Sequence, residues 1–191
     1  MAKLESTFLN MFLTLFIVTA LSSLAASVVY NMTKGPIAEV ARQKQQKAIE
    51  QVLPGFTDLK RFSVMPANGQ DSLVFFEGTN DGEVVGVAVN TYTNLGYSGL
   101  IKLMVGFKPD GTIVNYEVLD HKETPGLGSK IAEGFKTQFN GTNPSQTTLK
   151  VKKDGGEIDA ITAATISSRA VCDALQRASA AYEEVKKQQN D

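Results

Sequence analysis

Hydrophobic residues are distributed very unevenly along this chain. From Phe8 to about Val29 the sequence is almost continuously apolar, interrupted only by Asn10 and a few serines and threonines, and it carries no charge. A stretch of about 20 apolar residues is long enough to cross the hydrocarbon core of a membrane as a helix. The pattern therefore predicts a transmembrane helix over residues 8–30, preceded by a short N-terminal segment, residues 1–7.

A cleaved signal peptide is the alternative interpretation of this segment, because Leu24–Ser27 offers a small-residue cleavage site. However, the single basic residue before the apolar run, Lys3, is offset by Glu5. The run is also longer than the roughly 7–15 residues of a signal-peptide core. We therefore favour an uncleaved anchor. Basic residues flank both of its ends, so the positive-inside rule alone does not orient it.

Residues 31–54 are predicted to form a juxtamembrane amphipathic helix. Gly35-Pro36 is expected to break the chain after the anchor, and Pro54-Gly55 is expected to end the second helix. Apolar positions between these signals recur with helical spacing. The stripe comprises Ile37, Val40, Ala41, Ala48, Val52 and Leu53, and the opposite face carries Arg42, Lys44 and Lys47. We expect this helix to position the following domain, with binding of a partner protein as the alternative.

The pattern then changes to short runs rich in β-branched and aromatic residues. These predicted strands are Ser72–Glu77, Glu83–Thr93, Leu100–Lys108 and Ile113–Leu119. Asn80-Asp81-Gly82 separates the first pair, and Pro109-Asp110-Gly111-Thr112 separates the last pair. Both are hairpin-turn sequences, so they predict an antiparallel sheet.

Helical periodicity returns after the sheet. A short helix is predicted from Lys130 to about Phe139, and Leu149–Val151 is a candidate short strand. The last helix is predicted from about Ser168 to Lys187, with Ser167 or Ser168 as its N-cap. A sheet followed by helices gives an α+β fold class for residues 55–191, a length sufficient for one core.

Composition limits the chemistry available to this domain. Lys and Arg number 19 against 20 Asp and Glu, a net charge of -1, which argues against a nucleic-acid-binding protein. The single cysteine, Cys172, and the single histidine, His121, exclude an iron–sulfur or zinc site built from several such ligands. We expect Cys172 to be a buried apolar residue and His121 to be structural. Any redox chemistry then requires an organic cofactor or a metal held by a partner.

Three segments are candidates for binding. Asp159–Thr165 precedes the last helix, whose free N–H groups favour an anion, although its hydroxyls could simply cap the helix. Asp120–Gly128 contains a proline and two glycines that expose backbone groups to a planar ligand, or it is only a tight connection. In the turn Gly96–Gly99, Tyr97 is either a ligand neighbour or a core tyrosine.

These segments, in this order and spacing, resemble a known family. Gly96-Tyr97-x-Gly99, the hairpin Val105–Gly111, His121–Gly128 and the sequence Asp159-x-x-Thr-x-Ala-Thr165 are similar to motifs of the FMN-binding domain. With one N-terminal anchor, nearly the whole chain resembles the G-subunit family of the Rnf ion-translocating oxidoreductase complex. The C subunit of the sodium-pumping NADH:quinone oxidoreductase, usually a longer chain, is a related alternative.

The resemblance implies one covalently attached FMN per chain. Its phosphoester would join the hydroxyl of Thr165, transferred from FAD by a flavin transferase. The other matching positions, expected near the cofactor, are Asp159, Thr162 and Ala164 in the motif and Glu123, Thr124, Gly126 and Leu127 in the loop. Ala163 departs from the usual glycine, which matters only if the backbone requires a positive φ.

The function implied by the resemblance is electron transfer, with no catalytic residue or metal site in the chain itself. The protein would relay electrons between ferredoxin and NAD in a pathway coupled to Na⁺ or H⁺ translocation. Its partners would be other membrane subunits of the complex. The family is expected in the inner membrane of a bacterium, with the N-terminus inside and the FMN-binding domain, residues 55–191, on the periplasmic side. A stand-alone membrane-anchored flavoprotein and a non-redox anchored module are the alternatives.

Overall fold

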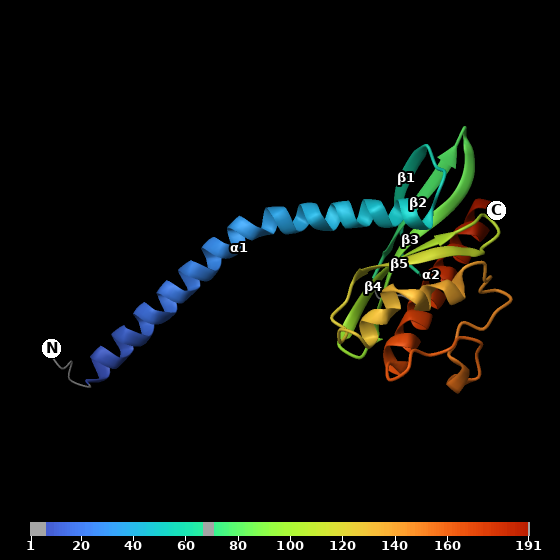
Figure 1. The fold of residues 1–191 in the computed structure, drawn as a ribbon. Helices are drawn as coiled ribbons and strands as arrows, with labels where there is room; N and C mark the ends of the chain where they lie inside the picture. The colour runs from blue at the N-terminus through green and yellow to red at the C-terminus, as the bar shows by residue number, and fades with distance from the viewer. Residues whose placement is uncertain (1–6, 67–70, 191) are drawn as a thin grey trace. The chain divides into compact units, whose positions relative to one another are not determined.

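The computed structural model of the protein describes residues 7–66 and 71–190. The chain divides into two compact units, Met1–Gln43 and Lys44–Asp191. In its described part, the first unit consists of Thr7 and most of a long helix, α1 (Phe8–Val52). The second unit contains the end of α1 and the folded domain (Figure 1). Apart from Thr7, the predicted cytoplasmic segment lies outside the described residues.

Helix α1 contains a candidate membrane span near its N-terminal end. Its most apolar window has a mean hydropathy of 2.2, and none of that window is buried against the protein. By length and composition, this helix is able to cross a membrane. The threonines within it donate their hydroxyls to carbonyls one turn earlier, such as Thr14 Oγ1 to Asn10 O at 2.7 Å. The hydroxyls of Thr14 and Thr19 are thereby satisfied within the helix.

The predicted break at Gly35-Pro36 is wrong, because α1 continues through Pro36 without interruption. A proline removes one helical hydrogen bond, and the loss can be tolerated when the turns on both sides are strong. Only the end of the predicted apolar stripe is buried: Ile37 and Val40 are more than 60% exposed, at 64% and 63%, whereas Val52 and Leu53 are 0% and 2% exposed. The separation into transmembrane and juxtamembrane parts remains a prediction.

The domain is built on a five-stranded antiparallel sheet in the order β1-β2-β3-β4-β5. Its strands are β1 (Asp58–Val64), β2 (Leu73–Asn80), β3 (Glu83–Gly96), β4 (Gly99–Phe107) and β5 (Ile113–Asp120). The four predicted strands and the α+β class are confirmed. Strand β1 was not predicted, because it lies at the sheet edge and most of its side chains are exposed, which weakens the alternating pattern.

The turns set the register of the sheet. Asn80 pairs with Glu83 across the two-residue turn Asp81-Gly82, and both turn residues have positive φ, 51° and 85°. This is the geometry that Asp-Gly favours in a β-hairpin. Gly96 pairs with Gly99 across a second two-residue turn, between β3 and β4, which places Tyr97 and Ser98 at the end of the sheet.

Helix α2 (Thr165–Asn190) covers one face of the sheet, and the end of α1 covers part of the other (Figure 1). Side chains alternate between the two faces, so Val87 and Val89 pack toward α2 while Ala88 packs toward α1. Two threonines of β3 join α2 by hydrogen bonds: Thr91 Oγ1 donates to Ala174 O at 3.1 Å, and Thr93 Oγ1 donates to Asp173 Oδ2 at 2.7 Å. These bonds fix the position of α2 along the strand.

Three glycines on adjacent strands receive the end of α1. A Cβ on Gly78 of β2 would lie 2.6 Å from Leu53 Cδ2, one on Gly86 of β3 would lie 2.7 Å from Leu53 Cδ1, and one on Gly106 of β4 would lie 1.9 Å from Val52 O. We call Gly78, Gly86 and Gly106 the glycine socket. Because these positions have no side chains, the helix end can approach the sheet at backbone contact.

The region between β5 and α2 differs from the predicted single helix. Two short 3₁₀ helices, η1 (Gly128–Ala132) and η2 (Gly134–Phe139), are separated at Glu133. Glycine at position 134 disfavours a continuous α-helix here. The predicted apolar face is nevertheless correct, because Ile131, Phe135 and Phe139 are buried. The candidate strand Leu149–Val151 is reduced to a single bridge between Val151 and Ile158.

Candidate functional site

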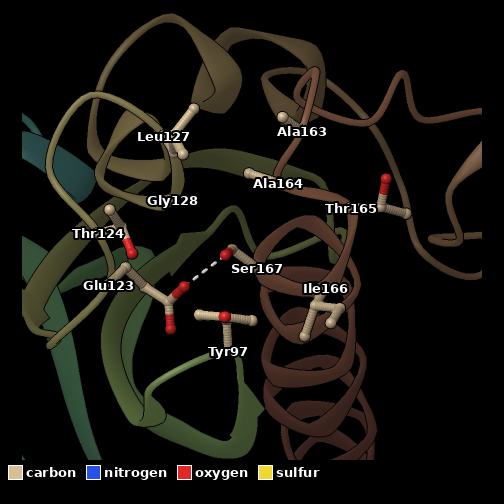
Figure 2. A pocket seen from close by; sticks show the side chains of 10 residues that line it. All are labelled: Tyr97, Glu123, Thr124, Leu127, Gly128, Ala163, Ala164, Thr165, Ile166 and Ser167. Carbon is tan, nitrogen blue, oxygen red and sulfur yellow. Dashed lines mark hydrogen bonds between the residues drawn. The ribbon is translucent and has the colours of Figure 1, made fainter.

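A pocket of about 410 Å³ lies between the loop that follows β5 and the start of α2 (Figure 2). It is lined by Tyr97, Glu123, Thr124, Leu127, Gly128, Ala163, Ala164, Thr165, Ile166 and Ser167. The three segments singled out in the sequence, which are far apart along the chain, therefore meet at one pocket. Its size lies within the range of small-molecule and cofactor sites.

Helix α2 begins at this pocket. Thr165 is its first residue, three residues earlier than the predicted Ser168. The first helical hydrogen bond runs from Ser168 N to Ala164 O at 3.0 Å. The N–H groups of Thr165, Ile166 and Ser167 thus precede the hydrogen-bonded part of the helix, as at any helix start. Together with the helix dipole, they favour an anion in the pocket.

Four hydroxyl groups surround this helix start, and the structure distinguishes between them. Ser168 Oγ donates to Ala164 O and accepts from Ile161 N, both at 3.0 Å, and Ser167 Oγ donates to Glu123 Oε2. Both serines therefore hold the fold together and neither is the predicted N-cap. The hydroxyls of Thr162 and Thr165 make no hydrogen bond with any residue in 7–66 or 71–190, and only Thr165 lines the pocket.

The loop after β5 forms the opposite wall of the pocket. The carbonyl of Thr124 accepts N–H groups from Leu127 and Ser129, both at 3.2 Å. Gly126 has a φ of 75°, so the turn requires the conformational freedom of glycine there. Leu127 is 43% exposed at the pocket, although leucine is an apolar residue. Glu123, Thr124 and Leu127 line the pocket, whereas Gly126 shapes the loop without lining it. Their predicted contact with a cofactor remains a prediction.

Two predicted site residues, Asp159 and Thr162, lie outside the pocket lining. Asp159 forms an exposed ion pair with Lys152, with Nζ and Oδ2 2.7 Å apart, and its backbone exchanges two hydrogen bonds with the Gln138 side chain. An ion pair of this exposure contributes little stability. The predicted contact of these two residues with a cofactor remains a prediction.

The sequence did not indicate the role of three residues that line the pocket. Tyr97 is 69% exposed, which decides against a core tyrosine and leaves it as a side chain presented at the pocket. Ile166, which is 46% exposed, was not predicted as a site residue. Its position as an apolar residue directly after Thr165 could have indicated that it lies near a ligand. Ser167 was interpreted only as a cap, because its partner Glu123 lies 44 residues away in sequence.

The two isolated reactive side chains have structural roles. Cys172 is buried, and burial raises the pKa of its thiol to about 12, so the thiolate is not accessible near neutral pH. His121 Nδ1 accepts the N–H of Glu123 at 3.1 Å and so shapes the loop. Among the described residues, no group of three or more His, Cys, Asp or Glu side chains is arranged to hold a metal ion.

Comparison with known proteins is consistent with this site. The model of the FMN-binding domain family matches residues 96–180, a range that contains every residue lining the pocket. The G subunit of the ion-translocating oxidoreductase complex of Salmonella typhi is 37% identical over 178 residues, which cover 87% of this chain and 86% of the relative. The chain belongs to the G-subunit family of ion-translocating oxidoreductase complexes.

Two further relatives of this chain are also G subunits of such complexes. The G subunit of the ion-translocating oxidoreductase complex of Methanosarcina acetivorans is 33% identical over 86% of the chain and 89% of the relative. The G subunit of the Na⁺-translocating ferredoxin:NAD⁺ oxidoreductase complex of Acetobacterium woodii is 31% identical over 92% of the chain and 91% of the relative. The resemblance found in the sequence is confirmed, and the alternative of a non-redox anchored module is not supported.

The pocket of this family member fits the chemical features of FMN. The phosphate is an anion, and the start of α2 supplies free N–H groups for one. The isoalloxazine ring is planar and largely apolar, and Tyr97, Leu127 and Ile166 present exposed apolar surface at the same pocket. The free N–H groups at the start of α2 would therefore hold the phosphate, and Tyr97, Leu127 and Ile166 would contact the ring.

Ala163 has a φ of 61°, the left-handed conformation that favours glycine. It is the third residue of a turn closed by Ala164 N donating to Ile161 O at 2.9 Å. A left-handed alanine costs about 1–2 kcal/mol. The departure from the family's glycine is therefore strained in this chain.

Ala163→Gly is expected to raise the free energy of unfolding by about 0.5–1 kcal/mol, since released strain exceeds the added entropy of the unfolded chain. Denaturant unfolding of the variant and the wild type measures this difference in unfolding free energy. Ala160→Gly, at a position without positive φ, is the matched control and is expected to destabilise by about 0.5–1 kcal/mol. Equal destabilisation by both substitutions would contradict the assigned conformation.

Proposed function

We propose that this protein carries FMN covalently, through a phosphoester on the Thr165 hydroxyl. One observation carries the proposal: of the four hydroxyls around the start of α2, the two serines are hydrogen-bonded within the fold and Thr162 lies outside the pocket lining. Thr165 alone combines an unengaged hydroxyl, a place in the pocket lining and a position at the helix start. A phosphodiester charge is favoured there.

The attachment requires a separate flavin transferase with FAD as donor. A bond forms between Thr165 Oγ1 and the FMN phosphorus, the diphosphate bond of FAD breaks, AMP leaves, and the threonine proton is released. The acceptor must be reachable by this enzyme, and Thr165 is partly exposed. The Ala163-Ala164 pair next to it presents no large side chain, so another protein can approach the backbone.

The proposed role of the chain is electron transfer within the complex. FMN supplies the redox chemistry, and the protein supplies position and electrostatics. The relative from Acetobacterium woodii is named as part of a Na⁺-translocating ferredoxin:NAD⁺ oxidoreductase. By extension, this protein relays electrons between ferredoxin and NAD through redox centres of its membrane partners, coupled to Na⁺ or H⁺ movement. No charged side chain lies between Phe8 and Val29, so the ion path belongs to other subunits.

The proposed topology places α1 across the inner membrane, with the N-terminus inside and the FMN-binding domain on the periplasmic side. The supporting observations are the fully exposed apolar span and the folded unit that follows it. A covalent tether suits this location, because a dissociable cofactor would be lost to the extracytoplasmic space.

In-gel fluorescence of the denatured wild-type protein tests the covalent attachment. The full chain is produced with and without its flavin transferase, denatured, separated by electrophoresis and viewed under ultraviolet light. We expect a fluorescent band only when the transferase is present, because a phosphoester survives denaturation. A colourless wild-type band after production with the transferase would reject the proposal.

A further inference from the structure

Glu123 is the meeting point of three segments of the pocket wall. Its side chain comes from the loop after β5, and the residue is 4% exposed. Oε1 accepts the backbone N–H of Ser98 at 2.9 Å, from the turn between β3 and β4. Oε2 accepts the hydroxyl of Ser167, from the first turn of α2 (Figure 2). One carboxylate therefore joins the sheet end, the loop and the helix start.

Two glycines leave the space that this carboxylate occupies. A Cβ at Gly96 would lie 2.8 Å from Oε1, and a Cβ at Gly128 would lie 2.6 Å from Oε2 and 2.8 Å from Ser167 Oγ. Real side chains do not approach this closely without displacement of their neighbours. Gly96 thus lies against one carboxylate oxygen of Glu123 and Gly128 against the other, so a side chain at either position would displace the carboxylate.

The electrostatics argue against a direct contact between Glu123 and the FMN phosphate. Within residues 7–66 and 71–190, no Lys, Arg or His nitrogen lies within 4.0 Å of its carboxylate. A buried charge without a cation depends on its hydrogen bonds, and here each oxygen has one donor from the protein. A phosphate brought against this carboxylate would be repelled.

We propose that Glu123 and Ser167 form a positioning bridge, which holds the first turn of α2 so that the Thr165 hydroxyl is presented to the flavin transferase. Ser167 follows Thr165 by two residues in the same helical turn, so fixing Ser167 fixes the direction of Thr165. Glu123 then acts on Thr165 through Ser167 rather than by contacting the phosphate. This inference rests on the proposed attachment of FMN to Thr165.

The glutamine variant separates the bridge from the charge. In Glu123→Gln, the amide oxygen can still accept the Ser98 N–H, and the amide nitrogen can donate to Ser167 Oγ, which is both donor and acceptor. A bridge therefore survives while the negative charge is lost. Glu123→Ala removes both the bridge and the negative charge. Ser167→Ala removes the hydroxyl by which α2 takes part in the bridge, with a smaller change in side-chain volume.

The experiment measures the initial rate of FMN incorporation into full-length apoprotein in detergent, with purified flavin transferase and FAD. We expect Glu123→Ala and Ser167→Ala to load at least about tenfold more slowly than wild type, as for loss of a buried hydrogen bond to a charged group. Glu123→Gln is expected within about threefold of wild type. The double variant Glu123→Ala/Ser167→Ala should load no more slowly than Glu123→Ala alone, because both changes remove one interaction.

Glu157→Ala, at an exposed glutamate, is the matched control and should load at the wild-type rate. If Glu123→Ala does not fold, the comparison of Ser167→Ala with wild type and Glu123→Gln decides the outcome. Equal slowing by Gln and Ala at position 123, or wild-type loading of Ser167→Ala, would overturn the bridge. A wild-type protein that never acquires FMN would instead overturn the proposed attachment itself.

Discussion

Thr165→Ala is expected to abolish covalent FMN while leaving the domain folded. The acceptor oxygen is removed, so no phosphoester can form at position 165. The fold should tolerate the change, because the Thr165 hydroxyl has no hydrogen-bond partner in the described part of the chain and alanine is the best helix former. The expected change in unfolding free energy is within about 0.5 kcal/mol.

The measurement combines in-gel fluorescence after production with the transferase and a thermal melt of the same sample. Thr162→Ala is the matched control, since it removes an equally unengaged threonine hydroxyl three residues earlier that does not line the pocket. It should retain the wild-type fluorescence. A fluorescent Thr165→Ala band together with a colourless Thr162→Ala band would move the attachment point to Thr162.

Gly106→Ala is expected to give the largest loss of stability among single methyl additions in this domain. Its Cβ would stand 1.9 Å from Val52 O and 2.6 Å from Val52 C, so the obstacle is backbone and no rotamer change relieves it. The end of α1 must move away from the sheet and expose Val52 and Leu53, which are now buried. We expect a loss of about 3 kcal/mol.

A thermal melt of full-length protein in detergent measures this effect, with an expected fall in Tm of roughly 6–12 °C. Gly134→Ala is the control, because no atom lies within 4 Å of its added Cβ and its φ is not positive. The glycine socket lies on the α1 face of the sheet and α2 lies on the other, so Gly106→Ala should still accept FMN at low temperature. A Tm equal to that of Gly134→Ala would contradict the close approach of α1.

Local signals predicted most of the sheet, and the resemblance to the FMN-binding family predicted the assembly of the pocket. The turn sequences around Asp81-Gly82 and Asp110-Gly111 carry their own conformational preferences, so the strands beside them were placed to within a few residues. Motif order brought the turn Gly96–Gly99, the β5 loop and Thr165 into one hypothesis, and the structure places all three at one pocket. The turns depend on residues close together in sequence, whereas the pocket joins segments that are far apart along the chain.

The features that were missed depend on tertiary contacts. Strand β1 pairs only with β2 and is mostly exposed, so its sequence lacks a buried alternation. The roles of Ser167 and Glu123 follow from a bond across 44 residues. The continuity of α1 through Pro36 and the left-handed conformation of Ala163 both oppose the intrinsic preference of the residue concerned. Single-sequence patterns cannot indicate where surrounding structure overrides that preference.

Peptide mapping of the flavinylated wild-type protein tests the central claim most directly. Cleavage after Lys153 and Arg169 releases residues 154–169, which contain Thr162, Thr165, Ser167 and Ser168 together. Fragmentation mass spectrometry of this peptide then locates the added group. We predict one FMN, less one water, on Thr165. The same mass on Thr162, Ser167 or Ser168, or an unmodified peptide from fluorescent protein, would contradict the account.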